Sequence, residues 1–172
     1  MKTDMVKLVT FQLGLDLFAA DVFSVERVLR YTSPSAVPDV PEWIEGVIEH
    51  RGQVIPVVDM RRRIGLGDFE ITPDTRVLVL TTADGWVGAI VDAVHEVASI
   101  PATSVTQPPA LFRGLSAAFV RGIAKVRDQL IVVLDVDRVL TSAARIAFDR
   151  ASGAGEQSLP AVPAAPAVAA RA

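Results

Sequence analysis

The sequence contains no cysteine and only two histidines among its 172 residues. Without cysteine, disulfide bonds and thiolate metal sites are both excluded, which fits a reducing compartment. His50 and His95 lie far apart in the sequence, and neither has a second histidine at the spacing that a zinc site needs. We therefore expect no metal site and no cofactor, and we interpret each histidine as a partly exposed polar side chain.

Long apolar runs are also missing. The segment from Leu8 to Ala20 is apolar, but Gln12 and Asp16 interrupt it, and Asp4 breaks the basic stretch that a signal peptide needs. No run approaches the roughly 20 apolar residues that cross a bilayer. These absences predict a cytoplasmic protein with no direct membrane insertion.

A basic surface is the third absence. The formal net charge is −3 and the pI is about 5.4, whereas nucleic-acid recognition normally begins with a basic footprint. The only basic run is Arg61-Arg62-Arg63. We interpret it as a solvated helical turn whose arginines face nearby acids, in preference to a nucleic-acid or lipid patch. No nucleic-acid partner is expected.

Catalytic motifs are absent as well. The sequence has no Gly-x-Ser-x-Gly nucleophile motif and no cysteine nucleophile. The stretch from Gly65 to Gly67 lacks the third glycine of a dinucleotide fingerprint and favours a helix end followed by a loop. Three acids, Asp59, Asp92 and Asp135, occur at related places in the chain, which indicates turns or strand ends. The sequence therefore predicts no catalytic residues and no enzyme.

What the sequence does contain is apolar residues in strand-like patterns. Hydrophobic residues make up 51% of the chain and charged residues 22%, so a sizeable core can form. Two segments each predict a β-hairpin, and the Asp-Gly pair of the second supplies the positive φ of a tight turn. The first hairpin is Leu8 to Leu13, Gly14 to Asp16 and Leu17 to Ala20; the second is Val77 to Leu80, Asp84-Gly85 and Trp86 to Val91.

The two hairpins belong to a longer internal match. A shift of 69 residues superimposes Ala20, Val22, Val25 and Val28 on Ala89, Val91, Val94 and Val97. A shift of 76 superimposes Gly46, Arg51, Gln53, Ile55, Val57, Asp59 and Arg62 on Gly122, Arg127, Gln129, Ile131, Val133, Asp135 and Arg138. Two ordered matches with one insertion between them indicate a duplicated unit of about 70 residues.

Each unit predicts about five short antiparallel strands, which favours a small β-barrel because closure removes exposed sheet edges. A barrel of about 70 residues is marginally stable alone, so we expect the two to share a buried interface. We place the first barrel in residues 1–72, with its N-terminal strand open to exchange with the second. The second barrel and a C-terminal helix occupy residues 73–150, and residues 151–172 form a disordered Ala/Pro-rich tail.

The stretch from Gly46 to Arg61, GVIEHRGQVIPVVDMR, resembles the signature G-V-x-N-L-R-G-x-V-I-P-V-I-D-L-R of the CheW family of chemotaxis coupling proteins. Further similar segments are Val22 to Val28, Val87 to Val94, and Val120 to Lys125 leading into Leu130 to Leu140. The resemblance covers residues 5–145. It implies two SH3-like five-stranded barrels with a shared core, in a mainly β protein with short helices.

The resemblance also implies a function and partners. Proteins of this family are non-catalytic adaptors that bridge the cytoplasmic tips of methyl-accepting chemotaxis receptors to a CheA-type histidine kinase, docking beside its regulatory domain. An alternative is a CheW-like regulatory module of another two-component signalling assembly. The start at Met1 and the low-complexity tail argue against a longer fused protein. An unrelated β-barrel enzyme or ligand carrier would need polar residues that converge in a pocket, and the sequence offers few.

Site residues follow from the same resemblance. It implies receptor-binding positions at Val25, Arg27, Arg51 and Val97, and glycines on which coupling depends at Gly46, Gly88 and Gly122. Three structural interpretations stay open: Arg51 could tie down backbone carbonyls, Val25 and Val97 could belong to the core, and the glycines could serve turns and close strand packing.

The chain also departs from the family signature. Glu49-His50 stands where Asn-Leu is usual, and Arg27 stands where many members have Glu. A reversed charge at a rim position repels one partner and attracts another. We therefore hypothesise a variant receptor or an alternative chemosensory pathway.

Overall fold

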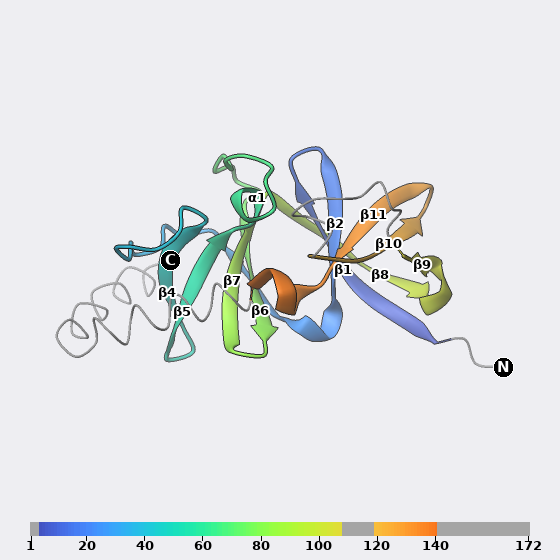
Figure 1. Cartoon of the computed structure of the whole chain (residues 1–172), viewed down its shortest axis with the longest axis horizontal. Coiled ribbons are helices and arrows are strands. Elements are labelled where there is room, and N and C mark those ends of the chain that lie inside the picture. The colour runs from blue at the N-terminus through green and yellow to red at the C-terminus, as the bar shows by residue number, and fades with distance from the viewer. Residues whose placement is uncertain (1–3, 108–118, 141–172) are drawn as a thin grey trace.

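The computed structural model describes residues 4–107 and 119–140. Within these ranges the chain forms two β-sheets side by side, with short helical turns between strands (Figure 1). The five-stranded sheet, which we call the first barrel, has the order β3 (Val25–Arg30), β6 (Arg76–Thr82), β7 (Gly85–Val91), β5 (Gln53–Asp59), β4 (Ile44–His50). The six-stranded sheet, the second barrel, has the order β8 (Ala93–Pro101), β1 (Met5–Leu13), β2 (Asp16–Asp21), β11 (Gln129–Leu134), β10 (Val120–Val126), β9 (Val105–Thr106).

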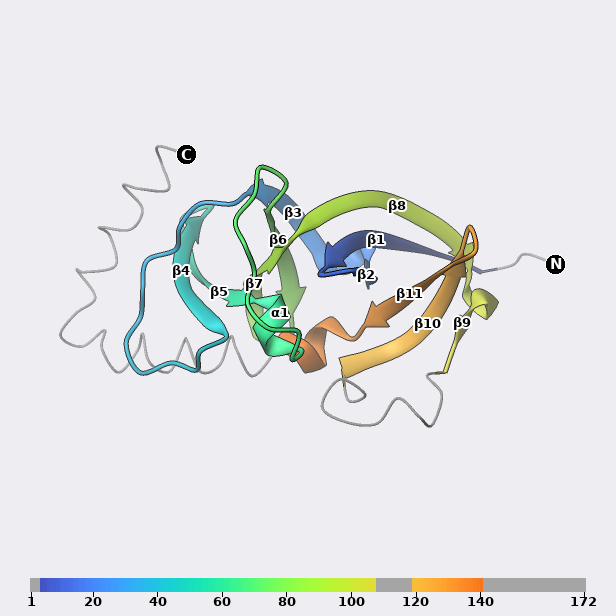
Figure 2. The ribbon, with the colours of Figure 1, turned by 90° about the horizontal axis from the view of Figure 1, so that it is seen from above.

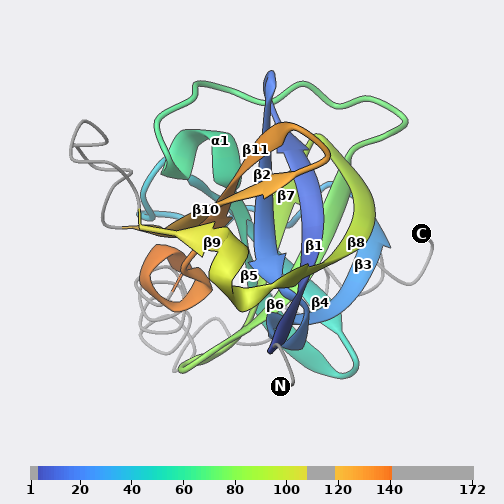
Figure 3. The ribbon, with the colours of Figure 1, turned by 90° about the vertical axis from the view of Figure 1, so that its right-hand side faces the viewer.

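Each hairpin pairs with strands of the other sequence repeat. The N-terminal hairpin, β1 and β2, lies between β8 and β11, so the blue strands of Figure 1 lie among yellow-green and orange ones. The second hairpin, β6 and β7, lies between β3 and β5. Figure 3 shows the same neighbours from the side, with β1 between β2 and β8. The two repeats have therefore exchanged hairpins reciprocally.

The strand registers confirm the duplication that the sequence indicates. Val9 pairs with Ala20 in the first hairpin, and Leu78 pairs with Ala89 in the second. The parallel contacts agree as well, since Ala19 faces Val133 in one barrel and Gly88 faces Val57 in the other. Residues separated by the shifts of 69 and 76 thus occupy equivalent places.

A single apolar cluster joins the two sheets. Phe11 and Phe18 of the second barrel pack in the same cluster as Val58, Leu78 and Leu80 of the first, and all five are buried. Smaller clusters fill each barrel separately. Burying one such side chain contributes about 1.5–3 kcal/mol, and this shared cluster holds more buried residues than either smaller one. The predicted mainly β fold with a shared core is confirmed.

The helical turn α1 (Met60–Arg63) lies where the two sheets meet, and its arginines hold them together. Asp59 caps α1 through the N–H groups of Arg61 and Arg62. The Arg61 guanidinium contacts Asp92, which also accepts a hydrogen bond from the backbone N–H of Gly14 at 2.6 Å. These contacts tie α1 to the β1–β2 turn and to the β7–β8 link.

The expectation of a fully solvated arginine turn is wrong for Arg63. Its guanidinium lies over the rings of Trp43 and Phe119, at 4.4 and 4.6 Å from their centroids, and donates to the carbonyl of Val139. Trp43 and Phe119 are separated by the shift of 76 residues, so Arg63 lies between equivalent side chains of the two repeats. Burial lowers the pKa of Arg63.

Strands of the two sheets alternate along the chain, whereas the predicted domains divide it once, at residue 72. The N-terminal hairpin lies with the second barrel and residues 76–91 lie with the first. The division of the chain into two domains at residue 72 stays a prediction. Residues 136–140 are helical, with Val139 and Leu140 buried. The rest of the predicted C-terminal helix and the tail 151–172 lie outside the described residues. No helix in the described ranges has the length and apolar character to cross a bilayer.

Candidate functional site

Val25 and Arg27 lie at the beginning of β3, the edge strand of the first barrel. The pairing of β3 with β6 shifts between these two residues, which leaves Glu26 as the extra residue of a β-bulge. The Val25 side chain is half-buried against the shared core, whereas Arg27 is exposed. The core interpretation therefore holds in part for Val25, and Arg27 is free to meet a partner.

Arg51 forms the tip of the β4–β5 hairpin beside this bulge. Arg51 and Gly52 have φ values of 49° and 77°, as a two-residue type I′ turn requires. The Arg51 guanidinium lies 3.0 Å from the Glu26 carboxylate, and the Arg51 side chain is 56% exposed. Among the described residues no hydrogen bond joins Arg51 to a backbone carbonyl, so the guanidinium is held at the surface by a carboxylate.

The second barrel has a similar ion pair, although its glutamate is the repeat equivalent of Arg27 and not of Glu26. Arg127, the equivalent of Arg51, also has a positive φ of 48°, and its guanidinium lies 2.9 Å from the Glu96 carboxylate on edge strand β8. In both barrels a hairpin tip is therefore linked to the bulged edge strand by an exposed ion pair. Glu26 and Glu96 could not be predicted as these partners, because their positions beside the tips depend on the strand pairing.

Val97 lies on β8, in the second barrel, and its side chain is 54% exposed. Its repeat equivalent, Val28 on β3, is exposed as well. The core interpretation therefore does not hold for Val97. Figures 2 and 3 place β3 and β8 along the same side of the molecule, although the two strands belong to different sheets. The contact of Arg51 with Glu26 brings three of the four predicted receptor-binding residues together, and Val97 lies apart from them on the second sheet.

The three glycines lie where another chain segment approaches closely. A Cβ at Gly46, where φ is 150°, would lie 2.1 Å from the backbone oxygen of Ser35, which pairs with Val47 beside the bulge of β4. A Cβ at Gly122 would lie 2.6 Å from Val105 Cγ1 and 2.8 Å from Thr106 O. At Gly88 the nearest atom is Val77 Cγ1 at 3.0 Å. Their geometry supports the interpretation of close strand packing.

His50 is buried, which corrects the expectation of a partly exposed side chain. Its ring lies 5.2 Å from that of Trp86 in an edge-to-face arrangement. Burial and then the neighbouring Arg51 lower the pKa of His50, which favours the neutral ring. The repeat equivalent of His50 is the apolar Val126, and that correspondence was the available signal for burial.

The described residues hold no cluster suited to metal binding, because nowhere in 4–107 and 119–140 do three His, Asp or Glu side chains gather around one point. Asp59 is buried, and burial raises its pKa, while its Oδ1 accepts hydrogen bonds from the backbone N–H groups of Arg62 and Arg61. The buried Asp59 therefore caps α1, and the buried His50 packs against Trp86. At the surface, the edge strands β3 and β8 each carry an exposed valine and a glutamate paired with an arginine.

Comparison with known proteins gives consistent results. A sequence model described as "CheW-like domain" matches residues 7–144. The chain is 31% identical over 134 residues to the chemotaxis protein CheW of Bacillus subtilis, covering 78% of this chain and 86% of the relative. It is 31% identical over 129 residues to protein FrzA of Myxococcus xanthus, covering 74% and 80%. The crystal structure of the scaffolding protein TtCheW from Thermoanaerobacter tengcongensis is similar with a TM-score of 0.74 and 37% identity, covering 79% of this chain and 92% of that one.

Proposed function

The chain belongs to the CheW-like family of non-catalytic chemotaxis scaffold proteins, and from this premise we propose that it couples the cytoplasmic tips of methyl-accepting chemotaxis receptors to a CheA-type histidine kinase. In this role it supplies binding surfaces and carries out no reaction. Both proposed partners act in the cytoplasm, which is therefore the proposed location. The kinase contact is proposed to be with the regulatory domain.

The observation that carries the receptor contact is the exposed Arg51 guanidinium, held by Glu26 next to Arg27 on a free sheet edge. A receptor tip is a helical coiled coil that offers an apolar stripe flanked by charges, and such a stripe suits apolar side chains rimmed by charged ones. The exposed Val28 on β3 and Val97 on β8 are proposed to supply the apolar contacts. The planar guanidinium can form a two-pronged hydrogen bond that a lysine cannot reproduce.

The Glu26–Arg51 pair also explains how Arg51 is available. An exposed ion pair contributes only about 0–1 kcal/mol to stability, so a receptor carboxylate can replace Glu26 at little cost. Until then Glu26 keeps the guanidinium 3.0 Å from its carboxylate. The side chain is therefore oriented before the partner arrives.

The glycines are proposed to support coupling through the shape of the backbone. Gly46 lies on β4, the strand that leads into the Arg51 turn, and its close approach to Ser35 leaves no space for a side chain. Gly122 has the equivalent place in the second barrel. A side chain at either position would displace strands that present the partner surfaces, so coupling is proposed to depend on these glycines indirectly.

The experiment is a titration of the full chain against the regulatory domain of the CheA-type kinase of the same organism, and separately against a receptor cytoplasmic fragment. We expect both to bind, and Arg51→Ala to weaken receptor binding about tenfold, as for loss of one charged contact. Lys125→Ala, which removes a charge from the corresponding hairpin of the second barrel, is the matched control and leaves receptor binding unchanged. A folded protein that binds neither partner would overturn the proposal.

Arg27 carries the proposed preference for a variant receptor. It is exposed beside the Arg51–Glu26 pair, where a glutamate would reverse the local charge. We expect Arg27→Glu to weaken binding to the native receptor fragment, because a rim charge selects its partner by repulsion as well as attraction. The same titration at low and high salt measures this, and tighter binding by Arg27→Glu would contradict the preference.

A further inference from the structure

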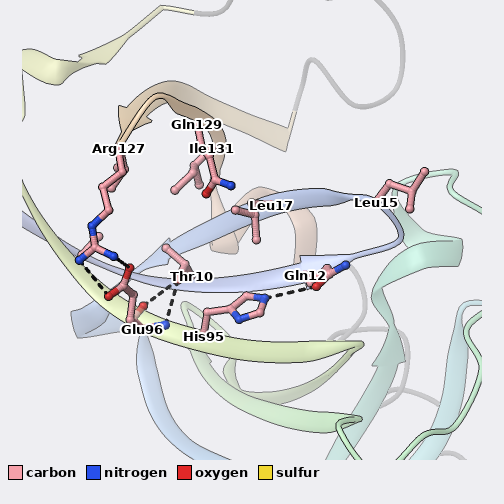
Figure 4. A pocket seen from close by; sticks show the side chains of 11 residues that line it. Thr10, Gln12, Leu15, Leu17, His95, Glu96, Arg127, Gln129 and Ile131 are labelled. Carbon is pink, nitrogen blue, oxygen red and sulfur yellow. Dashed lines mark hydrogen bonds and ion pairs between the residues drawn. The ribbon is translucent and has the colours of Figure 1, made fainter.

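The second barrel contains a cavity of about 640 Å³ between its strands (Figure 4). Its apolar floor includes Leu17, Ala98 and Ile131, and its polar wall carries groups from β1, β8 and the β10–β11 turn. Ligand sites in proteins commonly have volumes of roughly 300–1,000 Å³, with an apolar lining and a few polar groups. The cavity has both characteristics.

The two repeats differ in the side chains that fill this space. In the first barrel Trp86 lies against His50, with 5.2 Å between their ring centroids. Leu17 pairs with Gln12 as Trp86 pairs with Thr81, and Val126 pairs with Gln129 as His50 pairs with Gln53. Leu17 and Val126 are therefore the equivalents of the two rings. Their smaller side chains leave open the space that an indole and an imidazole occupy in the first barrel.

Polar side chains on one side of this space are held in fixed positions. The Thr10 hydroxyl donates to the carbonyl of Glu96 at 2.8 Å and accepts from the N–H of Glu96 at 3.1 Å, which secures the bulged part of β8. His95 Nε2 lies 3.3 Å from Gln12 Oε1, and the Gln12 amide donates to the carbonyl of Gly14. Among the described residues no hydrogen bond engages the Gln129 side chain, so its amide is available to a ligand.

One positive and one negative group stand at the edge of the cavity, in contact with each other. The Arg127 guanidinium lies 2.9 Å from the Glu96 carboxylate, and the two side chains are 76% and 52% exposed. Exposed ion pairs contribute little to stability, so a ligand can insert between the two groups or add to them. A ligand with a single charge would be attracted by one of these two groups and repelled by the other, which lies beside it.

We propose that this cavity binds a small amphipathic zwitterion of the α-amino acid type. The ligand carboxylate accepts hydrogen bonds from the Arg127 guanidinium, and its ammonium group donates to Glu96. The Arg127 guanidinium and the Glu96 carboxylate lie as close together as the carboxylate and ammonium groups that share the α-carbon of an amino acid. The Gln129 amide gives a further hydrogen bond to the carboxylate, and an apolar side chain covers Leu17, Ala98 and Ile131.

The proposed site is separate from the receptor surface. Side chains alternate along a strand, so Ala98 of β8 faces the cavity while the neighbouring Val97 points out of the opposite face. Binding of the zwitterion is measured on the chain alone. Its failure therefore leaves the adaptor proposal standing, and the reverse is also true.

The test is a titration of the ¹⁵N-labelled full chain with L-leucine, followed by NMR. We expect saturable shifts of the Thr10, Glu96 and Gln129 amide signals. N-acetyl-leucine, which lacks the ammonium group, and leucinamide, which lacks the carboxylate, are expected to bind about tenfold more weakly or worse, because each forfeits a charged contact. Absence of saturable shifts with L-leucine, or equal binding by the two analogues, would overturn the proposal.

Variants inside and outside the cavity test whether leucine binds there. Leu17→Trp, which places at this position the residue that the first barrel has at Trp86, should fill the cavity and abolish the leucine-dependent shifts. Arg127→Ala should weaken them, and Lys125→Ala in the same hairpin should not, since Lys125 does not line the cavity. If Leu17→Trp fails to fold, the exposed Gln129→Ala replaces it. Unaltered leucine binding by Arg127→Ala and by the cavity variant would sink the assignment.

Discussion

The first barrel packs Trp86 against His50, whereas the second barrel has Leu17 and Val126 at the same two places and retains a cavity of about 640 Å³. Both barrels nevertheless share their strand registers and their bulged edge strands, and each has an Arg–Glu pair at a hairpin tip. The difference shows that a duplicated frame can keep its backbone pairing while its interior diverges. Backbone geometry and side-chain filling are therefore separable in this fold.

The largest expected effect tests the shared backbone. We expect Gly46→Ala to lower the free energy of unfolding by about 3 kcal/mol, since a Cβ 2.1 Å from Ser35 O forces a backbone shift at an unfavourable φ. Gly122→Ala, at the equivalent position, should lower it less, and Gly88→Ala least, since its nearest contact is a side-chain methyl at 3.0 Å. Urea unfolding of the three variants measures the order. Equal losses would show that the contact distances do not govern the cost.

The next test exchanges the side chains that the two barrels have at the equivalent positions Trp86 and Leu17. Trp86→Leu should destabilise the first barrel by about 2 kcal/mol, because it removes a large side chain from packed surroundings and leaves a void. Leu17→Trp should change the free energy of unfolding much less, since the second barrel already has the space. Urea unfolding followed by circular dichroism compares the pair. Equal losses from the two variants would mean that the interiors are alike.

A pH dependence should distinguish the barrels, because only the first has an imidazole at this position. Burial lowers the pKa of His50 below its ordinary value of 6.5, so the folded state binds its proton less readily than the unfolded state does. The stabilisation is complete above pH 6.5 and is lost as the pH falls below that value. We expect His50→Leu to flatten the free energy of unfolding between pH 7 and 5.5. An unchanged pH profile would contradict the role of His50.

The smallest effect concerns the hairpin tips. Arg51→Ala and Arg127→Ala should each change the free energy of unfolding by no more than about 0.5 kcal/mol, because both ion pairs are exposed. Thermal unfolding at low and high salt measures both variants. A large loss in either one would show a structural role for that arginine, and would weaken any conclusion drawn from its effect on binding.

The sequence predicted the duplication well, because alternating apolar residues record which strand face is buried. Identities such as Gly46 with Gly122 recorded the equivalent bulges. It left open an exchange of the N-terminal strand, but it did not predict that both hairpins are exchanged reciprocally. Both hairpins have the same pattern and fit either sheet, so the choice depends on how the β2–β3 and β7–β8 links direct the chain.

Prediction of the site was less complete. The exposure of Arg51 and Arg27 agrees with the family signature, but the role of Glu26 depends on a bulge that alternation alone does not reveal. The cavity was missed since its polar residues are scattered from Thr10 to Gln129 and meet only after folding. Comparing Trp86 with Leu17 and His50 with Val126 across the repeats would have indicated the unequal filling.

The reciprocal exchange of hairpins also determines how the chain can fold during synthesis. The strands β1 and β2 are made first, yet their neighbours β8 and β11 are made late, as the pairings of Val9 with Val97 and of Ala19 with Val133 show. Contacts so distant in sequence are slow to form, because the loop entropy is lost before the contacts compensate. A nascent chain therefore carries an unpaired apolar hairpin on the ribosome until most of the second repeat has emerged.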